Sequence, residues 1–229
     1  LGRFWRADWP RFFEIIRLGL PIAVIAMAEF GMFLASALLM GLLGTSPLAA
    51  HAIALQCVAV VYMVPLGISQ AAAVRVGRAV GAGNPLAAAR AGWVAMAVSF
   101  ALAVPPALLF WFWGGALVDL FLDGARPGNK ATIELAVSLL AVAALFQFAD
   151  ATQVTALGAL RGLKDTRGPM LIAIGGYWGL GLPAAALFGV YLNFGGQAVW
   201  IGLAVGLSVV AVFLVRRFRV HSLGAMDAP

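Results

Sequence analysis

The sequence predicts an all-α integral membrane protein, a bundle of six transmembrane helices, and three observations lead to this fold class. Hydrophobic residues make up 63% of the chain and charged residues only 10%, whereas soluble domains carry about 25% charged residues. The mean hydropathy of +1.00 is higher than a globular core can absorb, which makes lipid the natural solvent. Finally, six apolar stretches each reach the length of about 20 residues that crosses a bilayer.

Each expected helix is an apolar run bounded by turn-forming residues. In chain order the six helices span residues 18–43, 48–74, 87–113, 133–160, 169–190 and 197–215, and the second is expected to continue to residue 80. The connections contain GTSP at 44–47, GAGNP at 81–85, DGARPGN at 123–129, KDTRGP at 164–169 and NFGG at 193–196. Residues 1–17 are expected to form a basic amphipathic lead-in, residues 18–215 the bundle, and residues 216–229 a tail.

The basic residues support this division and predict the orientation of the bundle. Of the 15 Lys and Arg residues, 13 lie in alternate segments: the lead-in, the second and fourth connections, and the tail. Because Lys and Arg accumulate in cytoplasmic segments, both ends of this chain are expected in the cytoplasm. The same distribution argues against nucleic acid as the partner of this basic chain.

Other chemistry is not indicated by the sequence. Cys57, the only cysteine, lies in an apolar run and is expected to pack as a small hydrophobic residue. No GxxxxGK[ST] phosphate loop and no Cys/His cluster occurs, and no GxGD surrounds Asp150 as an intramembrane aspartyl protease would require. We therefore expect neither an enzyme nor a cofactor.

Two of the nine acidic residues, Glu29 and Asp150, lie deep inside predicted helices, whereas the other seven lie in loops, tails or helix ends. Glu29 follows Arg17 by 12 residues and Asp150 precedes Arg161 by 11, and both arginines mark the cytoplasmic edge. At a rise of about 1.5 Å per residue, both acids lie about 17 Å from that edge, near the middle of a core about 30 Å thick. Helices of opposite direction thus bring two carboxylates to one level, where no Lys or Arg is expected.

These two carboxylates predict a site that exchanges charge. A charged group at the bilayer centre costs roughly 2.5–3.5 kcal/mol, so an acid there is a candidate functional residue. The pair can take up protons or bind a cation such as Na⁺, in which case Glu29 and Asp150 are metal ligands. Either use suits an ion-coupled transporter. The alternative is that each acid stays protonated and joins helices by hydrogen bonds.

Further polar residues lie near the acids. Gln147 and Gln153 are three residues either side of Asp150, on about the same face of the helix. With Gln56 of the second helix and Phe146, they are candidate cavity-lining residues, with helix contacts or packing as the alternative.

Proline and glycine mark candidate hinges and contacts. Pro65, inside the second apolar run, is the hinge candidate, with a simple packing kink as the alternative. Gly77 and Gly81, and likewise Gly202 and Gly206, have the spacing of close helix contacts.

Three segments resemble the C-terminal half of the MATE family, the multidrug and toxic compound extrusion transporters. Residues 18–44 resemble its seventh helix, with the acidic residue at Glu29. Residues 49–85, with PLG, RVG and GAG, resemble the eighth helix and its loop, and residues 146–170, with RG-x-KDTR-x-P, resemble the tenth. The resemblance covers nearly the whole chain. It implies one lobe of a transporter in which two six-helix bundles enclose a cavity, with residues 1–17 as the linker between the lobes. The expected partner is therefore a missing N-terminal lobe or a second copy of this chain.

The resemblance also implies a function. Members are antiporters that export organic cations and other amphipathic compounds, driven by a H⁺ or Na⁺ gradient, and for this chain we expect the bilayer of a bacterial inner membrane. Glu29 and Asp150 match positions proposed to bind the coupling cation. Some members carry an aromatic hydroxyl one turn before the second acid, where this sequence has Phe146, and this difference favours H⁺. A lipid-linked precursor flippase of the same superfold and a non-transporting membrane subunit remain the alternatives.

Overall fold

The structure, a computed structural model, describes residues 8–124 and 126–224. The first part of the predicted lead-in, residues 1–7, and the last part of the predicted tail, residues 225–229, lie outside the described residues. Within the described part the chain is all-α, and six helical spans are long and apolar enough to cross a membrane.

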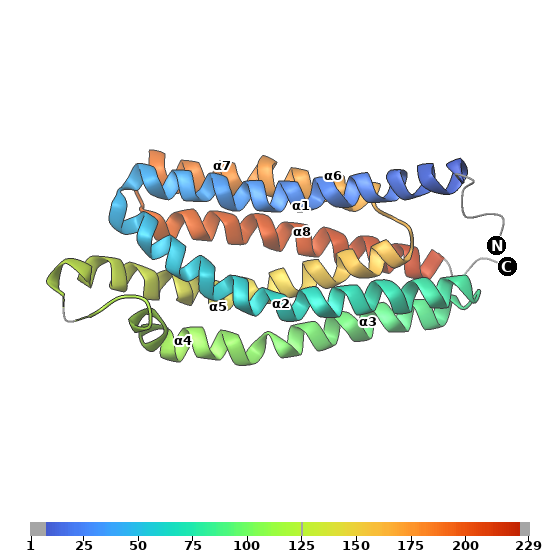
Figure 1. The fold of residues 1–229 in the computed structure, drawn as a ribbon, viewed down its shortest axis with the longest axis horizontal. Coiled ribbons are helices and arrows are strands. Elements are labelled where there is room, and N and C mark those ends of the chain that lie inside the picture. Colours follow the sequence, from blue (N-terminus) through green and yellow to red (C-terminus); the bar gives the residue numbers. More distant parts are fainter. Residues whose placement is uncertain (1–7, 125, 225–229) are drawn as a thin grey trace.

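The helices follow one another in an up-and-down order (Figure 1). They are α1 (Trp9–Leu43), α2 (Thr45–Gly81), α3 (Pro85–Leu102), α4 (Val104–Asp119), α5 (Lys130–Gly162), α6 (Arg167–Ile174), α7 (Leu182–Ala185) and α8 (Gly196–Gly224). A short 3₁₀ turn, η1 (Pro127–Asn129), precedes α5, and two π-helical segments, η2 (Gly175–Gly181) and η3 (Ala186–Tyr191), flank α7.

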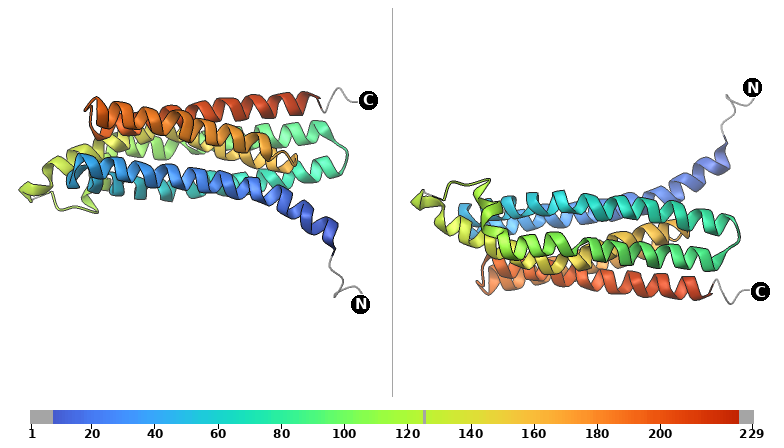
Figure 2. Two further views of the ribbon diagram at one scale, coloured as in Figure 1. Left: turned by 90° about the horizontal axis from the view of Figure 1, so that it is seen from above. Right: turned by 90° about the horizontal axis from the view of Figure 1, so that it is seen from below.

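Helix α5 forms the centre of the bundle and packs against α2, α3, α4 and α8. Half of its most apolar stretch is buried inside the bundle, compared with 22% for α1. Helix α1 begins and α8 ends at the same end of the bundle, and the first turns of α1 bend away from the other helices (Figure 2). The second acid is thus carried by one of the two most enclosed helices and the first by a peripheral one.

The helix boundaries differ from the prediction at the start of the first span and inside the third. The part of the lead-in from Trp9 onward is continuous with the first span, because Pro21 is accommodated without a break. The predicted third span over 87–113 is found within Pro85–Asp119, but a break at Ala103 divides it into α3 and α4. Pro105 and Pro106 lack the N–H groups that would continue the α-helical ladder, and the chain turns there.

The fifth span is only partly α-helical, since η2 and η3 have i→i+5 hydrogen bonding. Its glycines let it approach α8 closely: a Cβ on Gly206 would lie 2.6 Å from the Cα of Gly181. The predicted close contacts of Gly202 and Gly206 are therefore confirmed. The prediction for Gly81 is wrong, because a Cβ there would meet nothing within 4 Å.

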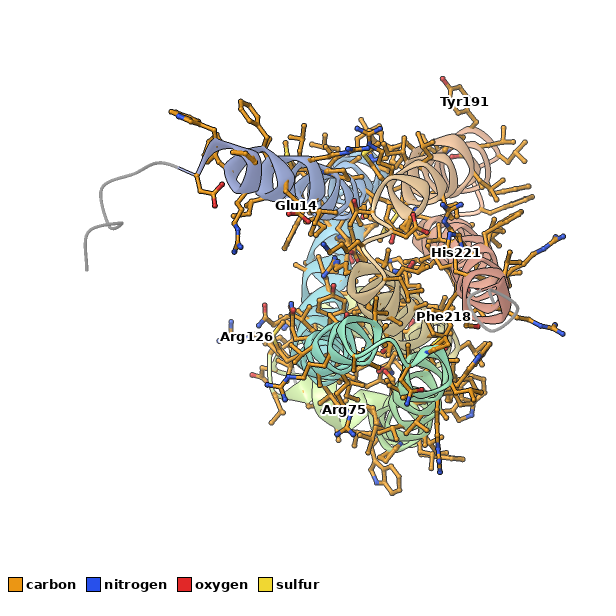
Figure 3. All side chains as sticks on the ribbon, turned by 90° about the vertical axis from the view of Figure 1, so that its right-hand side faces the viewer. Glu14, Arg75, Arg126, Tyr191, Phe218 and His221 are labelled. Atoms are coloured by element: carbon orange, nitrogen blue, oxygen red, sulfur yellow. The ribbon has the colours of Figure 1, made fainter. Side chains whose placement is uncertain are left out.

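The end of the bundle where α1 begins carries the ion pairs that fix its loops, and Figure 3 views the bundle from this end. Lys164, in the turn between α5 and α6, donates to Glu14 of α1 over 2.7 Å. The next residue, Asp165, accepts from Nε and Nη2 of Arg217 on α8 over 2.5 and 3.1 Å. The KDTRG motif thus ties α5 to the first turns of α1 and the last turns of α8.

Candidate ion-coupling site

Glu29 and Asp150 lie near the middle of α1 and α5, and they are close enough for their charges to interact. Asp150 is buried, with 6% of its surface exposed, and Glu29 is half-buried. Helix α2 packs against both α1 and α5 and so connects the two helices that carry the acids. Within residues 8–124 and 126–224, no ion pair within 4.0 Å includes either acid.

A chain of hydrogen bonds orients Asp150. Its Oδ1 accepts from Nε2 of Gln153 over 3.1 Å, and Oε1 of Gln153 accepts from the hydroxyl of Tyr177 over 2.9 Å. Gln153 and Tyr177 are both completely buried. Because each polar atom of the glutamine amide has a partner, the Gln153 side chain is fixed and holds one carboxylate oxygen of Asp150 in place.

Trp178, the residue after Tyr177, is hydrogen-bonded to α1, the helix that carries Glu29. Nε1 of Trp178 donates to the backbone carbonyl of Ala28 over 3.0 Å, one residue before Glu29. The Trp178 ring also lies over Gly31, where a Cβ would come within 2.8 Å of it. Two consecutive residues of the π-helical segment η2 therefore contact both α1 and α5 beside the acids.

We expect Tyr177→Phe to destabilise the bundle by about 1–3 kcal/mol, because it leaves a buried acceptor on Gln153 without its donor. Tyr191→Phe is the matched control, since Tyr191 is 81% exposed and points away from the bundle (Figure 3). Thermal unfolding of both variants in the same detergent measures the difference. Equal melting temperatures for the two variants would show that the Tyr177 hydroxyl contributes nothing.

The other predicted site residues occupy different environments. Gln147 is buried and lines a pocket that also includes Asp150. Gln56 is exposed and points away from the bundle core. Phe146 is buried against Trp200, with ring centroids 5.7 Å apart, so within this bundle it is a packing residue. Pro65 is buried within a continuous α2 and lines the same pocket as Gln147.

Sequence reasoning missed three groups that surround the acids. Tyr177 of η2 and Tyr62 of α2 lie within electrostatic range of both carboxylates, and the charge of Arg161 acts on Glu29. Arg161 was expected only to mark the cytoplasmic edge of α5, but its Nε is buried without a hydrogen-bond partner in the described part of the chain. The two tyrosines are two of only three in the chain, and their position inside apolar runs was the available signal.

Comparison with known proteins assigns this bundle to a family. The family model described as MatE matches residues 21–187. The chain belongs to the MatE family. This MatE chain is 51% identical over 217 residues to the probable multidrug resistance protein NorM of Mesorhizobium japonicum. The aligned region covers 95% of this chain and 46% of that protein. It is 44% identical over 224 residues to the multidrug resistance protein NorM of Burkholderia vietnamiensis, covering 98% of the chain and 48% of that protein.

Solved structures agree with this MatE assignment at the level of the fold. A MATE structure in complex with MaL6 superposes with a TM-score of 0.88 at 19% identity, covering 100% of this chain and 50% of that one. The eukaryotic MATE transporter AtDTX14 gives a TM-score of 0.83 at 24% identity, covering 95% and 49%. The MatE chain thus has the fold of one six-helix lobe of a MATE-type transporter in a multi-pass membrane protein, and it spans about half the length of the curated relatives it matches.

Proposed function

We propose that this MatE chain forms the ion-coupling lobe of an antiporter that exports organic cations and other amphipathic compounds. The observation that carries the proposal is the pair of acids, Glu29 and Asp150, near the middle of two membrane-spanning helices and without an ion pair in the described part of the chain. The names of the bacterial relatives, which are multidrug resistance proteins, support efflux of drugs as the task.

In the proposed cycle the two acids alternate between the coupling ion and a state that favours substrate. On the outward-facing side Glu29 and Asp150 take up the ion, which neutralises the site and displaces a cationic substrate. On the inward-facing side the ion leaves, and the restored negative charge attracts the next substrate. Because the two carboxylates interact, we expect the pair to titrate as a unit.

The donors around the acids favour H⁺ over Na⁺ as the coupling ion. Phe146 has no oxygen where some members carry an aromatic hydroxyl. A proton needs only the carboxylates themselves, whereas Na⁺ needs several oxygens around it. The Na⁺ alternative would draw on Glu29, Asp150 and the hydroxyl of Tyr62.

The proposed setting is a bacterial inner membrane, with both ends of this chain in the cytoplasm. The ion pairs of Lys164 and Arg217 and the buried Arg161 all lie at the end where α1 begins and α8 ends, and a basic end is typical of the cytoplasmic side. The substrate pathway would form between this lobe and a second six-helix lobe, supplied by the N-terminal half of the protein or by a second copy.

Efflux of a fluorescent organic cation from vesicles that contain the full-length protein tests this function. We expect an imposed H⁺ gradient to drive efflux against the dye gradient, and a Na⁺ gradient at equal pH to drive little, because the donor set favours the proton. Vesicles without protein are the control for leakage. Efflux that responds to neither gradient would contradict ion coupling, and efflux that responds to Na⁺ alone would contradict the choice of ion.

A further inference from the structure

A pocket of about 290 Å³ lies between α2, the break that separates α3 from α4, and the central helix α5. Its walls are mainly apolar, and its polar lining consists of Asp150, Gln147, Tyr62 and Ser99. The lining contains no Lys, Arg or His, so its chemistry excludes an anionic ligand. Asp150 therefore borders this pocket in addition to lying near Glu29.

Gln147 is the residue that indicates a ligand in this pocket. Only 4% of its surface is exposed, and both Nε2 and Oε1 are buried without a hydrogen-bond partner in the described part of the chain. Buried amide atoms are almost always hydrogen-bonded to protein or to ordered water, because desolvation without a partner is unfavourable. Gln147 therefore requires a partner that can both donate and accept, and the pocket it lines is where that partner fits.

Two prolines add acceptors at the same place. Pro65 lacks the N–H that would bond the carbonyl of Val61, and Pro106 lacks the N–H that would bond the carbonyl of Leu102. Val61 and Leu102 both line the pocket. Backbone carbonyls freed by proline inside a membrane are commonly satisfied by ordered water among other partners. The pocket thus combines a carboxylate, an amide and hydroxyls with two lining residues whose carbonyls have lost their helical donor.

We propose that this pocket binds a cluster of water molecules, anchored by Gln147, through which protons reach Asp150. Its volume of about 290 Å³ holds several waters at about 30 Å³ each, and its polar atoms together with neighbouring waters supply the two to four partners that each water needs. The role for protons rests on the proposed function, whereas the hydration does not. The charged and titratable groups around Asp150 are Glu29 of α1, Tyr62 of α2 and Tyr177 of η2, and Arg161 acts on Glu29 and Tyr62.

Cysteine labelling in the full-length protein, with its native cysteines replaced, tests the hydration directly. Ala151 and Ala144 are both on α5, two turns apart and 2% and 3% exposed, but only Ala151 lines the pocket. A charged, membrane-impermeant thiosulfonate reacts with the thiolate, which forms in water and is disfavoured in a dry core, so we expect Ala151→Cys to react at least about tenfold faster than Ala144→Cys. The reagent is applied from each side of the membrane in turn. Equal, slow labelling of both cysteines from both sides would overturn the proposal.

Two further arms separate the water cluster from other ligands and from the coupling mechanism. Adding Gln147→Leu to Ala151→Cys should slow labelling several-fold, because the waters lose their anchor, and unchanged labelling would overturn the role of Gln147. Complete protection of Ala151→Cys by a saturating organic cation would overturn water as the ligand in favour of substrate. Labelling does not depend on transport, so failure of the coupling mechanism would be seen separately, in the efflux of the Asp150 variant described below.

Discussion

Replacing either acid by its amide, as Asp150→Asn or Glu29→Gln, is expected to reduce ion-driven efflux to the level of vesicles without protein. An amide has nearly the shape of the carboxyl group, and in Asp150→Asn the new amide oxygen would still accept the hydrogen bond that Nε2 of Gln153 now donates. The fold should therefore persist, while the group can no longer take up a proton or carry a negative charge. Each variant thus removes one of the two carboxyl groups that exchange the ion and leaves the packing of the bundle in place.

The matched control is Glu134→Gln, which removes an exposed carboxylate from the same helix as Asp150. Glu134 pairs with Lys130 over 4.0 Å at the surface, where an ion pair contributes little, so we expect wild-type efflux and wild-type expression. Efflux is measured under the same imposed gradient for all three variants and normalised to the amount of folded protein. Retention of wild-type coupled efflux by Asp150→Asn or Glu29→Gln would exclude that acid from the coupling step.

The largest expected effect on stability comes from Gly158, where α5 crosses α2. The hydroxyl of Ser69 on α2 donates to the carbonyl of Val154 over 2.7 Å, and a Cβ on Gly158 would overlap the backbone carbonyl of Ser69. Backbone atoms cannot rotate away as a flexible side chain can, so the two helices would have to separate. We expect Gly158→Ala to cost about 1–3 kcal/mol and the larger Gly158→Val to prevent recovery of folded protein.

Gly67→Ala on α2 is the control for the intrinsic effect of replacing a helical glycine. Its added Cβ would meet nothing within 4 Å, and alanine is favoured over glycine in helices by up to about 1 kcal/mol, so this variant should be as stable as wild type or more stable. Thermal unfolding in one detergent compares the variants. If the Gly158→Ala and Gly67→Ala variants had the same melting temperature, the close contact between α2 and α5 would be refuted.

The six spans, and the position of the two acids near the middle of their helices, could be predicted because both depend on local properties of the sequence. Apolar length defines a span, and the residue count from Arg17 and Arg161 defines depth without knowledge of packing. The break at Ala103 was also within reach, since consecutive prolines at 105 and 106 are a local signal. The predicted helix over 87–113 includes these prolines as kinks within one helix.

The hydrogen bonds that hold the acids could not be predicted in the same way. Tyr177 reaches Gln153, and Trp178 reaches the carbonyl of Ala28, only because Gly175–Gly181 forms a π-helix with its own angular spacing. In a membrane-spanning segment that is apolar on most sides, the spacing of hydrophobic and polar residues hardly distinguishes a π-helix from an α-helix. The burial of Arg161 was missed for a related reason: residue counting locates its Cα near the end of α5, but not the environment of its long side chain.

The position of the acids halfway along α1 and α5 has an electrical consequence. An ion that reaches the pair from either face of the membrane crosses about half of the transmembrane potential, which amounts to ~1.2 kcal/mol per elementary charge at 100 mV. In the proposed mechanism, ion occupancy of Glu29 and Asp150 would therefore depend on voltage as well as on concentration. In an energised cell the membrane potential itself would load this site from outside, even when the pH on the two sides is equal.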